Sequence, residues 1–156
     1  MVCAPNQDDA VSNGGAGYII LGSTLYGYLS SPGYLYNDLS VADIIVYGAE
    51  SDGNLCIAAG GVDDIDGDTG SEVVFGARGE GSGDGAAYLF LGATIASGGT
   101  FDASTDADVQ FIGDSGTWLG ARATGLGDTD NDGMGDIGLG ASLDSTGTVL
   151  LFNGTY

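Results

Sequence analysis

The stretch GDTDNDGMGDIGLGA, residues 127–141, places acidic side chains at alternating positions and then runs directly into a small apolar segment. A second stretch, GVDDIDGDTGSEVVFGA at residues 61–77, follows the same pattern. Counted from Asp64 and Asp128, both carry acidic residues at positions 1, 3, 5 and 9 and end in Gly-Ala, with a constant offset of 64 residues. Two copies in one register indicate an internal repeat.

Strand-like segments recur in step with the acidic stretches. They are rich in β-branched and aromatic residues and bounded by Gly, Asp, Ser or Asn, which is typical of strands. Glycine is too frequent for stable helices. The sequence therefore predicts an all-β protein in which helix is nearly absent. The matching segments are 15–22, 85–92 and 147–154, then 42–48 and 107–113, then 54–60 and 118–125.

One repeat thus holds four short strands in about 62–65 residues, with the acidic loop between two of them. Such a unit is typical of a β-propeller blade, although the period also fits a β-sandwich or a β-solenoid. We expect a single domain over 1–156 with a partial blade at 1–48, a complete blade at 54–113 and a partial blade at 118–156. These form a partial β-propeller of about two and a half four-stranded antiparallel blades. A propeller needs at least four blades, so we expect the chain to work within a larger assembly.

The composition excludes several classes of function. The chain has 22 acidic and two basic residues, with a net charge of −20, whereas nucleic-acid binding requires a basic surface. No apolar run approaches the ~18 residues that membrane insertion needs. With no His and no Lys, a serine nucleophile or a proton-transfer site lacks its usual partner, so we expect no enzymatic activity.

The acidic loops predict two Ca²⁺ ions per chain. Alternating carboxylates converge when the backbone curls around a point, and Ca²⁺ accepts six to eight oxygen ligands. Position 7 would add a backbone carbonyl and position 9 a further carboxylate. An EF-hand would need Glu at position 12, which here is Phe75 or Leu139; zinc would prefer His or Cys. The remaining alternative is a solvated acidic turn. The predicted ligands are Asp64, Asp66, Asp68, Gly70 and Glu72, and Asp128, Asp130, Asp132, Met134 and Asp136.

The order of acidic loop, VVFGA or IGLGA, and then GAAYLFLG resembles the FG-GAP repeat of integrin α-subunit propellers and bacterial surface proteins. The resemblance implies a calcium-binding module for adhesion or surface interaction, located outside the cell or on its surface. Its ligand would be a protein or a carbohydrate. The sequence departs from the family at Thr69, which replaces the usual loop glycine, and at Asn54-Leu55 and Trp118-Leu119, which replace Phe-Gly. Two alternatives are a structural subunit that assembles with copies of itself and an ancillary segment of a secreted hydrolase.

A tyrosine-rich segment at residues 23–40 is a second candidate binding surface. Strand alternation would place Tyr26 with Tyr28 on one face of a strand and Tyr34 with Tyr36 on one face of the next, and a hairpin through Ser-Ser-Pro-Gly would bring the two pairs together. Exposed tyrosines make good contacts with protein or sugar. The alternative is that they cover the outer edge of a blade.

Cys3 and Cys56 are the only cysteines. The sequence favours two separate, half-buried thiols, because a disulfide requires the fold to bring the two segments together. The beginning of the chain, MVCAPNQDDA, has no basic region and no apolar core of the kind found in a secretory signal. We therefore interpret the chain as a mature form or as a piece of a longer protein.

Overall fold

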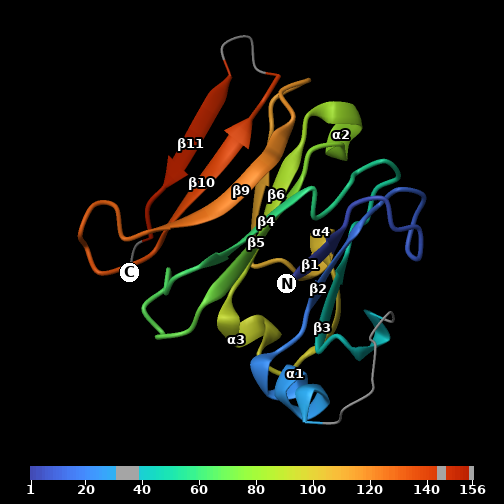
Figure 1. Cartoon of the computed structure of the whole chain (residues 1–156). Helices are drawn as coiled ribbons and strands as arrows, with labels where there is room; N and C mark the ends of the chain where they lie inside the picture. The colour runs from blue at the N-terminus through green and yellow to red at the C-terminus, as the bar shows by residue number, and fades with distance from the viewer. Residues whose placement is uncertain (31–38, 144–146, 155–156) are drawn as a thin grey trace.

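The chain folds into three β-sheets that lie side by side in a computed structural model, which describes residues 1–30, 39–143 and 147–154 (Figure 1). Sheet one contains β1 (Val2–Ala4), β2 (Ala16–Ile19), β3 (Ile44–Tyr47) and β7 (Gly99–Asp102), in that order. Sheet two contains β4 (Ala58–Val62), β5 (Glu72–Ala77), β6 (Ala86–Phe90) and β8 (Val109–Ile112). Sheet three contains β9 (Leu119–Gly127), β10 (Asp136–Ala141) and β11 (Thr148–Phe152). The prediction of an all-β protein is confirmed, and among the described residues no sheet closes on itself.

The two central strands of sheet two, β5 and β6, are buried on both faces, which explains why they read as nearly continuous apolar runs rather than as alternating ones. Phe75 pairs with Tyr88 across β5 and β6, and both face sheet one. Their neighbours Val74 and Leu89 pair in the same register and face sheet three. Successive side chains of a strand point to opposite faces, so this one pair of strands supplies both hydrophobic cores.

The repeat is visible in the backbone as well as in the sequence. The turn before β4 and the segment that leads into the start of β9 each carry three residues with left-handed φ, at positions offset by 64. Since non-glycine residues rarely adopt this conformation, the match indicates that the two turns have the same shape. The residues are Asp52 (62°), Asn54 (56°) and Cys56 (63°), and Gly116 (73°), Trp118 (56°) and Gly120 (79°).

Close backbone contact between sheets two and three leads to a stability prediction. A Cβ added at Gly76 in β5 would lie 1.9 Å from the carbonyl oxygen of Gly120. Because backbone atoms cannot move aside cheaply, we expect Gly76→Ala to lower the free energy of unfolding by about 3 kcal/mol. Gly61→Ala in β4 is the matched control, since nothing lies within 4 Å of its added Cβ, and it should change the free energy by less than about 0.5 kcal/mol. Urea denaturation measures both; equal effects would contradict the packing described.

Strand β7 departs from the expected plan. The segment 54–113 contributes the four strands of sheet two, as expected of one four-stranded unit, but it also contains the additional strand β7, which crosses to sheet one and pairs with β3 in parallel orientation. Ile44 aligns with Gly99 and Tyr47 with Asp102. The pairing of β7 with β3 connects sheet one to sheet two, because the chain must cross from sheet two to sheet one and back before it forms β8.

The expectation that helix is nearly absent is wrong for residues 22–29, which form α1 (Gly22–Leu29). Three short helices and one 3₁₀ helix are also present, and their bounds are η1 (Leu39–Val41), α2 (Glu80–Gly83), α3 (Gly92–Ile95) and α4 (Ala103–Asp106). Helix α1 replaces the strand on which Tyr26 and Tyr28 were expected to share a face. Tyr26 is 73% exposed. Tyr34 and Tyr36 lie outside the described residues.

A distant aspartate explains the first turn of α1. Asp43, just before β3, accepts hydrogen bonds from the Leu21 amide (2.7 Å) and the Thr24 hydroxyl (2.6 Å). These bonds, from Thr24 first, lower the pKa of Asp43. The second unit repeats the arrangement at α3, where Asp108 accepts from the Leu91 amide (2.8 Å) and the Thr94 hydroxyl (2.7 Å). Free amides at a helix start require such acceptors.

Cys3 and Cys56 form a disulfide, which corrects the expectation of two separate thiols. Their Cα atoms lie 5.2 Å apart across a sequence separation of 53 residues. The fold brings them together because Cys3 lies on the edge strand β1 and Cys56 lies in the turn that leads into β4. The bond therefore connects sheet one to the start of sheet two.

None of the described helices is long and apolar enough to cross a membrane.

Candidate metal centre

Both acidic loops connect neighbouring antiparallel strands of a sheet. The first joins β4 to β5, and the second joins β9 to β10. In each loop three carboxylate groups offer oxygen atoms that lie within 4.8 Å of one another. The converging groups are Asp64, Asp66 and Asp68 in the first loop and Asp128, Asp130 and Asp136 in the second.

The same hydrogen bonds shape the two loops. In each loop the carboxylate at position 1 accepts a hydrogen bond from the backbone amide at position 6. The carboxylate at position 3 accepts from the amide at position 5, and the carboxylate at position 5 accepts from the amide at position 7. The carboxylate at position 9 accepts from the amide at position 2. In the first loop the donors are Thr69 (2.9 Å), Asp68 (3.2 Å), Gly70 (2.6 Å) and Ile65 (2.9 Å). In the second they are Gly133 (2.9 Å), Asp132 (3.2 Å), Met134 (2.9 Å) and Thr129 (2.6 Å).

Two left-handed residues allow each loop to curl. They occupy positions 4 and 6, which are Gly67 (81°) and Thr69 (69°) in the first loop and Asn131 (65°) and Gly133 (97°) in the second. Glycine and asparagine tolerate this conformation, whereas a β-branched side chain does so only at a cost. Thr69 therefore keeps the loop shape despite replacing the glycine found at this position in the second loop.

Position 9 differs between the loops. Asp136 belongs to the converging group, and the hydroxyl and amide of Thr129 lower its pKa. Glu72 does not belong to it. It is fully buried and accepts from the Ile65 amide, and burial together with the charges of Asp66 and Asp64 raises its pKa.

The other predicted ligands lie in the loops without joining the converging groups. The carboxylate of Asp132 accepts from the Met134 amide instead. Gly70 and Met134 take part through their amides, and the Met134 side chain is buried. Sequence reasoning missed Asn153, whose side-chain amide donates to Asp130 (2.7 Å). Only the approach of the end of β11 to the second loop reveals this contact.

The two loops touch each other. The Gly135 amide, next to Asp136, donates to the backbone carbonyl of Asp64 over 2.6 Å. The clusters are therefore neighbours at one end of the molecule. The negative charge of each cluster raises the free energy needed to keep the carboxylates of the other cluster ionised. The atoms that the two clusters offer to a metal ion are all carboxylate oxygens, with no His or Cys among the residues. Ca²⁺ accepts such oxygen ligands, whereas zinc prefers His and Cys.

No protein-family model matches the chain, and a search of curated proteins finds no match either.

A buried carboxyl outside the loops predicts how stability depends on pH. Burial, followed by the charge of Glu50, raises the pKa of Glu80 from its ordinary 4.5 to about 7. The fold thus favours the protonated form, so its stabilising effect is complete below pH 4.5 and is lost as the pH rises through 7. Between pH 5 and pH 8 we expect the wild type to lose about 2.5 kcal/mol more than Glu80→Gln. Urea denaturation at both pH values in the same calcium buffer measures this; parallel pH profiles would contradict it.

Proposed function

We propose that this chain is a calcium-binding module of the FG-GAP β-propeller type that contacts a protein or carbohydrate surface outside the cell. The observation that carries the proposal is the repetition of one hydrogen-bonded carboxylate loop at an offset of 64 residues, each copy with three converging carboxylates. A chance acidic turn has no reason to reproduce the same donor positions and the same left-handed residues.

The charge of the chain supports the proposal. Several carboxylates held within 4.8 Å repel one another unless a cation or protons neutralise them. Two calcium ions would offset four of the 20 net negative charges. The Cys3–Cys56 disulfide supports the proposed location, because disulfides persist in oxidising compartments such as the cell exterior.

A binding assay on arrays of extracellular matrix proteins and glycans tests the proposed interaction. We expect capture of an array ligand in millimolar calcium and its loss in EDTA. Asp66→Asn combined with Asp130→Asn should abolish capture in calcium. The control is Asp9→Asn with Asp114→Asn, which removes the same charge from two exposed positions outside the loops and should leave capture intact. Capture that is equal in EDTA, or absent throughout, would contradict the proposed function.

The outer face of sheet three favours a second candidate, assembly with copies of the chain. Val149 and Leu151 alternate along β11 and are 80% and 53% exposed. On this face β10 offers only Gly138 and Gly140 opposite them. Among the described strands β11 pairs only with β10, so its other edge can accept a strand.

Sedimentation velocity in millimolar calcium tests this candidate. Assembly through sheet three should give species larger than one chain, and Val149→Glu with Leu151→Glu should return them to monomers. Leu25→Glu with Tyr26→Glu is the control, since it adds the same charge to exposed residues of α1. A monomer in calcium, or assembly that is insensitive to the β11 variant, would exclude this face as the contact.

A further inference from the structure

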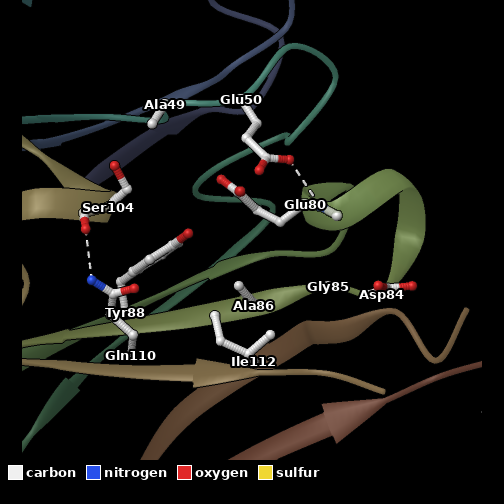
Figure 2. Close-up of a pocket in the computed structure, with 11 residues that line it drawn as sticks. Ala49, Glu50, Glu80, Asp84, Gly85, Ala86, Tyr88, Ser104, Gln110 and Ile112 are labelled. Atoms are coloured by element: carbon white, nitrogen blue, oxygen red, sulfur yellow. Dashed lines mark hydrogen bonds between the residues drawn. The ribbon is translucent and has the colours of Figure 1, made fainter. Parts of the chain in front are cut away.

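A pocket of about 270 Å³ lies away from the acidic loops, where segments of sheets one and two meet. Figure 2 shows its lining side chains arriving from separate elements. Glu50 follows β3, Glu80 begins α2, Tyr88 lies on β6, Ser104 on α4 and Gln110 on β8. The packing of these segments of sheets one and two therefore determines the shape of the pocket.

Glu80 is the unusual member of this pocket. Its side chain is only 6% exposed, and its Oε1 atom has no hydrogen-bond partner among the residues that the structure describes. Leaving a buried carboxylate oxygen unpaired is costly. The position of Glu80 is fixed by its neighbour Gly79, whose amide donates to the Gly53 carbonyl (3.0 Å) and whose added Cβ would lie 1.9 Å from the Asp52 carbonyl oxygen.

The charges around Glu80 are negative. Glu50 faces it and is itself held by the Gly81 amide, which donates to its Oε2 over 2.9 Å (Figure 2). The charge of Asp102 adds to this effect on the pKa of Glu80, while the Tyr88 hydroxyl partly offsets it. Burial and these charges hold the pKa of Glu80 above its ordinary value.

Neither arginine of the chain lines this pocket, so no arginine balances its negative charge. Arg78 stacks over the ring of Trp118 with its guanidinium carbon 5.0 Å from the ring centroid. Arg122 donates to the backbone carbonyl of Ala121 over 2.6 Å. Because these are the only basic residues of the sequence, a compensating organic cation has to come from another molecule.

We propose that the Glu50–Glu80 pocket binds a guanidinium or ammonium group of another molecule. A guanidinium fits best, because its planar fork pairs with carboxylate oxygens in bidentate fashion and stacks on aromatic rings, here that of Tyr88. A metal ion fits less well, since only two carboxylates converge. The third acid of the pocket, Asp84, accepts from the Gly116 amide (2.9 Å), and its carboxylate lies apart from those of Glu50 and Glu80 (Figure 2). This site is independent of the acidic loops and of the function proposed for them.

Isothermal titration in saturating calcium tests the proposal with methylguanidinium and with two tripeptides, Gly-Arg-Gly and Gly-citrulline-Gly. Citrulline has the shape of arginine without the charge, so of the two peptides only the one with arginine should bind. Binding of methylguanidinium alone would assign the site to free small cations, and binding of both methylguanidinium and the arginine peptide would assign it also to protein side chains.

Matched variants locate the binding. Glu80→Gln should weaken binding of the probe at least tenfold, and Glu50→Gln, which leaves the buried group in place, should weaken it by a smaller factor. Asp84→Asn is the control within the same pocket and should change the affinity less than threefold. No binding of either cation at millimolar concentration, equal binding of the citrulline peptide, or affinity unchanged in both glutamate variants would overturn the proposal. So would a third calcium ion that Glu80→Gln removes.

Discussion

Transfer from millimolar calcium to EDTA is expected to lower the free energy of unfolding by about 5 kcal/mol. A ligand that binds only the folded state stabilises it by about 2.7 kcal/mol at 100 times its Kd, and we propose two such sites in the chain. The structural reason is that each loop joins two adjacent strands and gathers three carboxylates within 4.8 Å. Without a cation their repulsion pushes apart the connection that those strands need.

Urea denaturation in calcium and in EDTA measures this effect. Asp66→Asn should remove about half of the calcium dependence, and its combination with Asp130→Asn should remove nearly all of it. The contact between Gly135 and Asp64 joins the loops, so the two single-variant effects need not add to the effect of the pair. A wild type whose denaturation midpoint is unchanged by EDTA would show that the loops do not bind calcium during folding.

Replacing both cysteines, Cys3→Ser with Cys56→Ser, is expected to lower the free energy of unfolding by about 4 kcal/mol. The disulfide closes a loop across a separation of 53 residues, and the chain-entropy model assigns about this stabilisation to a loop of such length. The bond also holds the three-residue strand β1, which among the described strands pairs only with β2. Its loss should therefore detach β1 first.

Thermal and urea denaturation with and without a reducing agent test the disulfide prediction. Reduction should bring the wild type to the stability of the double serine variant and should have no effect on that variant. Hydrogen exchange should show early loss of protection at the amides that join β1 to β2. A stability difference below about 1 kcal/mol would mean that the unfolded chain is not constrained by the bond.

Much of the strand pattern was predictable because the repeat places apolar segments between turn residues at fixed offsets. All seven matching segments contain or overlap a strand, although the strand expected at 54–60 begins only at Ala58. The delay follows from the three left-handed residues of the preceding turn, which break regular pairing there. The pairing of β7 with β3 was not predictable, because the two strands lie more than 50 residues apart in the sequence.

Local patterns failed where distant residues decide the structure. The alternating tyrosines of residues 26 and 28 suggested a strand, yet α1 forms there because Asp43 satisfies its first turn from another part of the chain. The disulfide likewise depends on the approach of β1 to the turn before β4. The Glu80 pocket is assembled from five separate segments and leaves no motif in the sequence.

The acidic loops were predictable in position and less so in detail. Spacing alone suggested that position 9 would complete both ligand sets, and Asp136 does join its cluster. Glu72 has one more methylene group and stays outside its cluster, although it is as buried as Asp136 and accepts the equivalent amide, that of Ile65. Such a difference depends on side-chain packing, which spacing does not encode.

The most direct test of the two calcium sites is their stoichiometry. Calorimetric titration of the calcium-free chain, combined with metal analysis after gel filtration, should give two ions per chain. Asp66→Ala with Asp130→Ala should give none, while the charge-matched control Asp9→Ala with Asp114→Ala should still give two. Zero or one ion per wild-type chain, or two ions in the Asp66→Ala and Asp130→Ala variant, would contradict the assignment of the acidic loops as calcium sites.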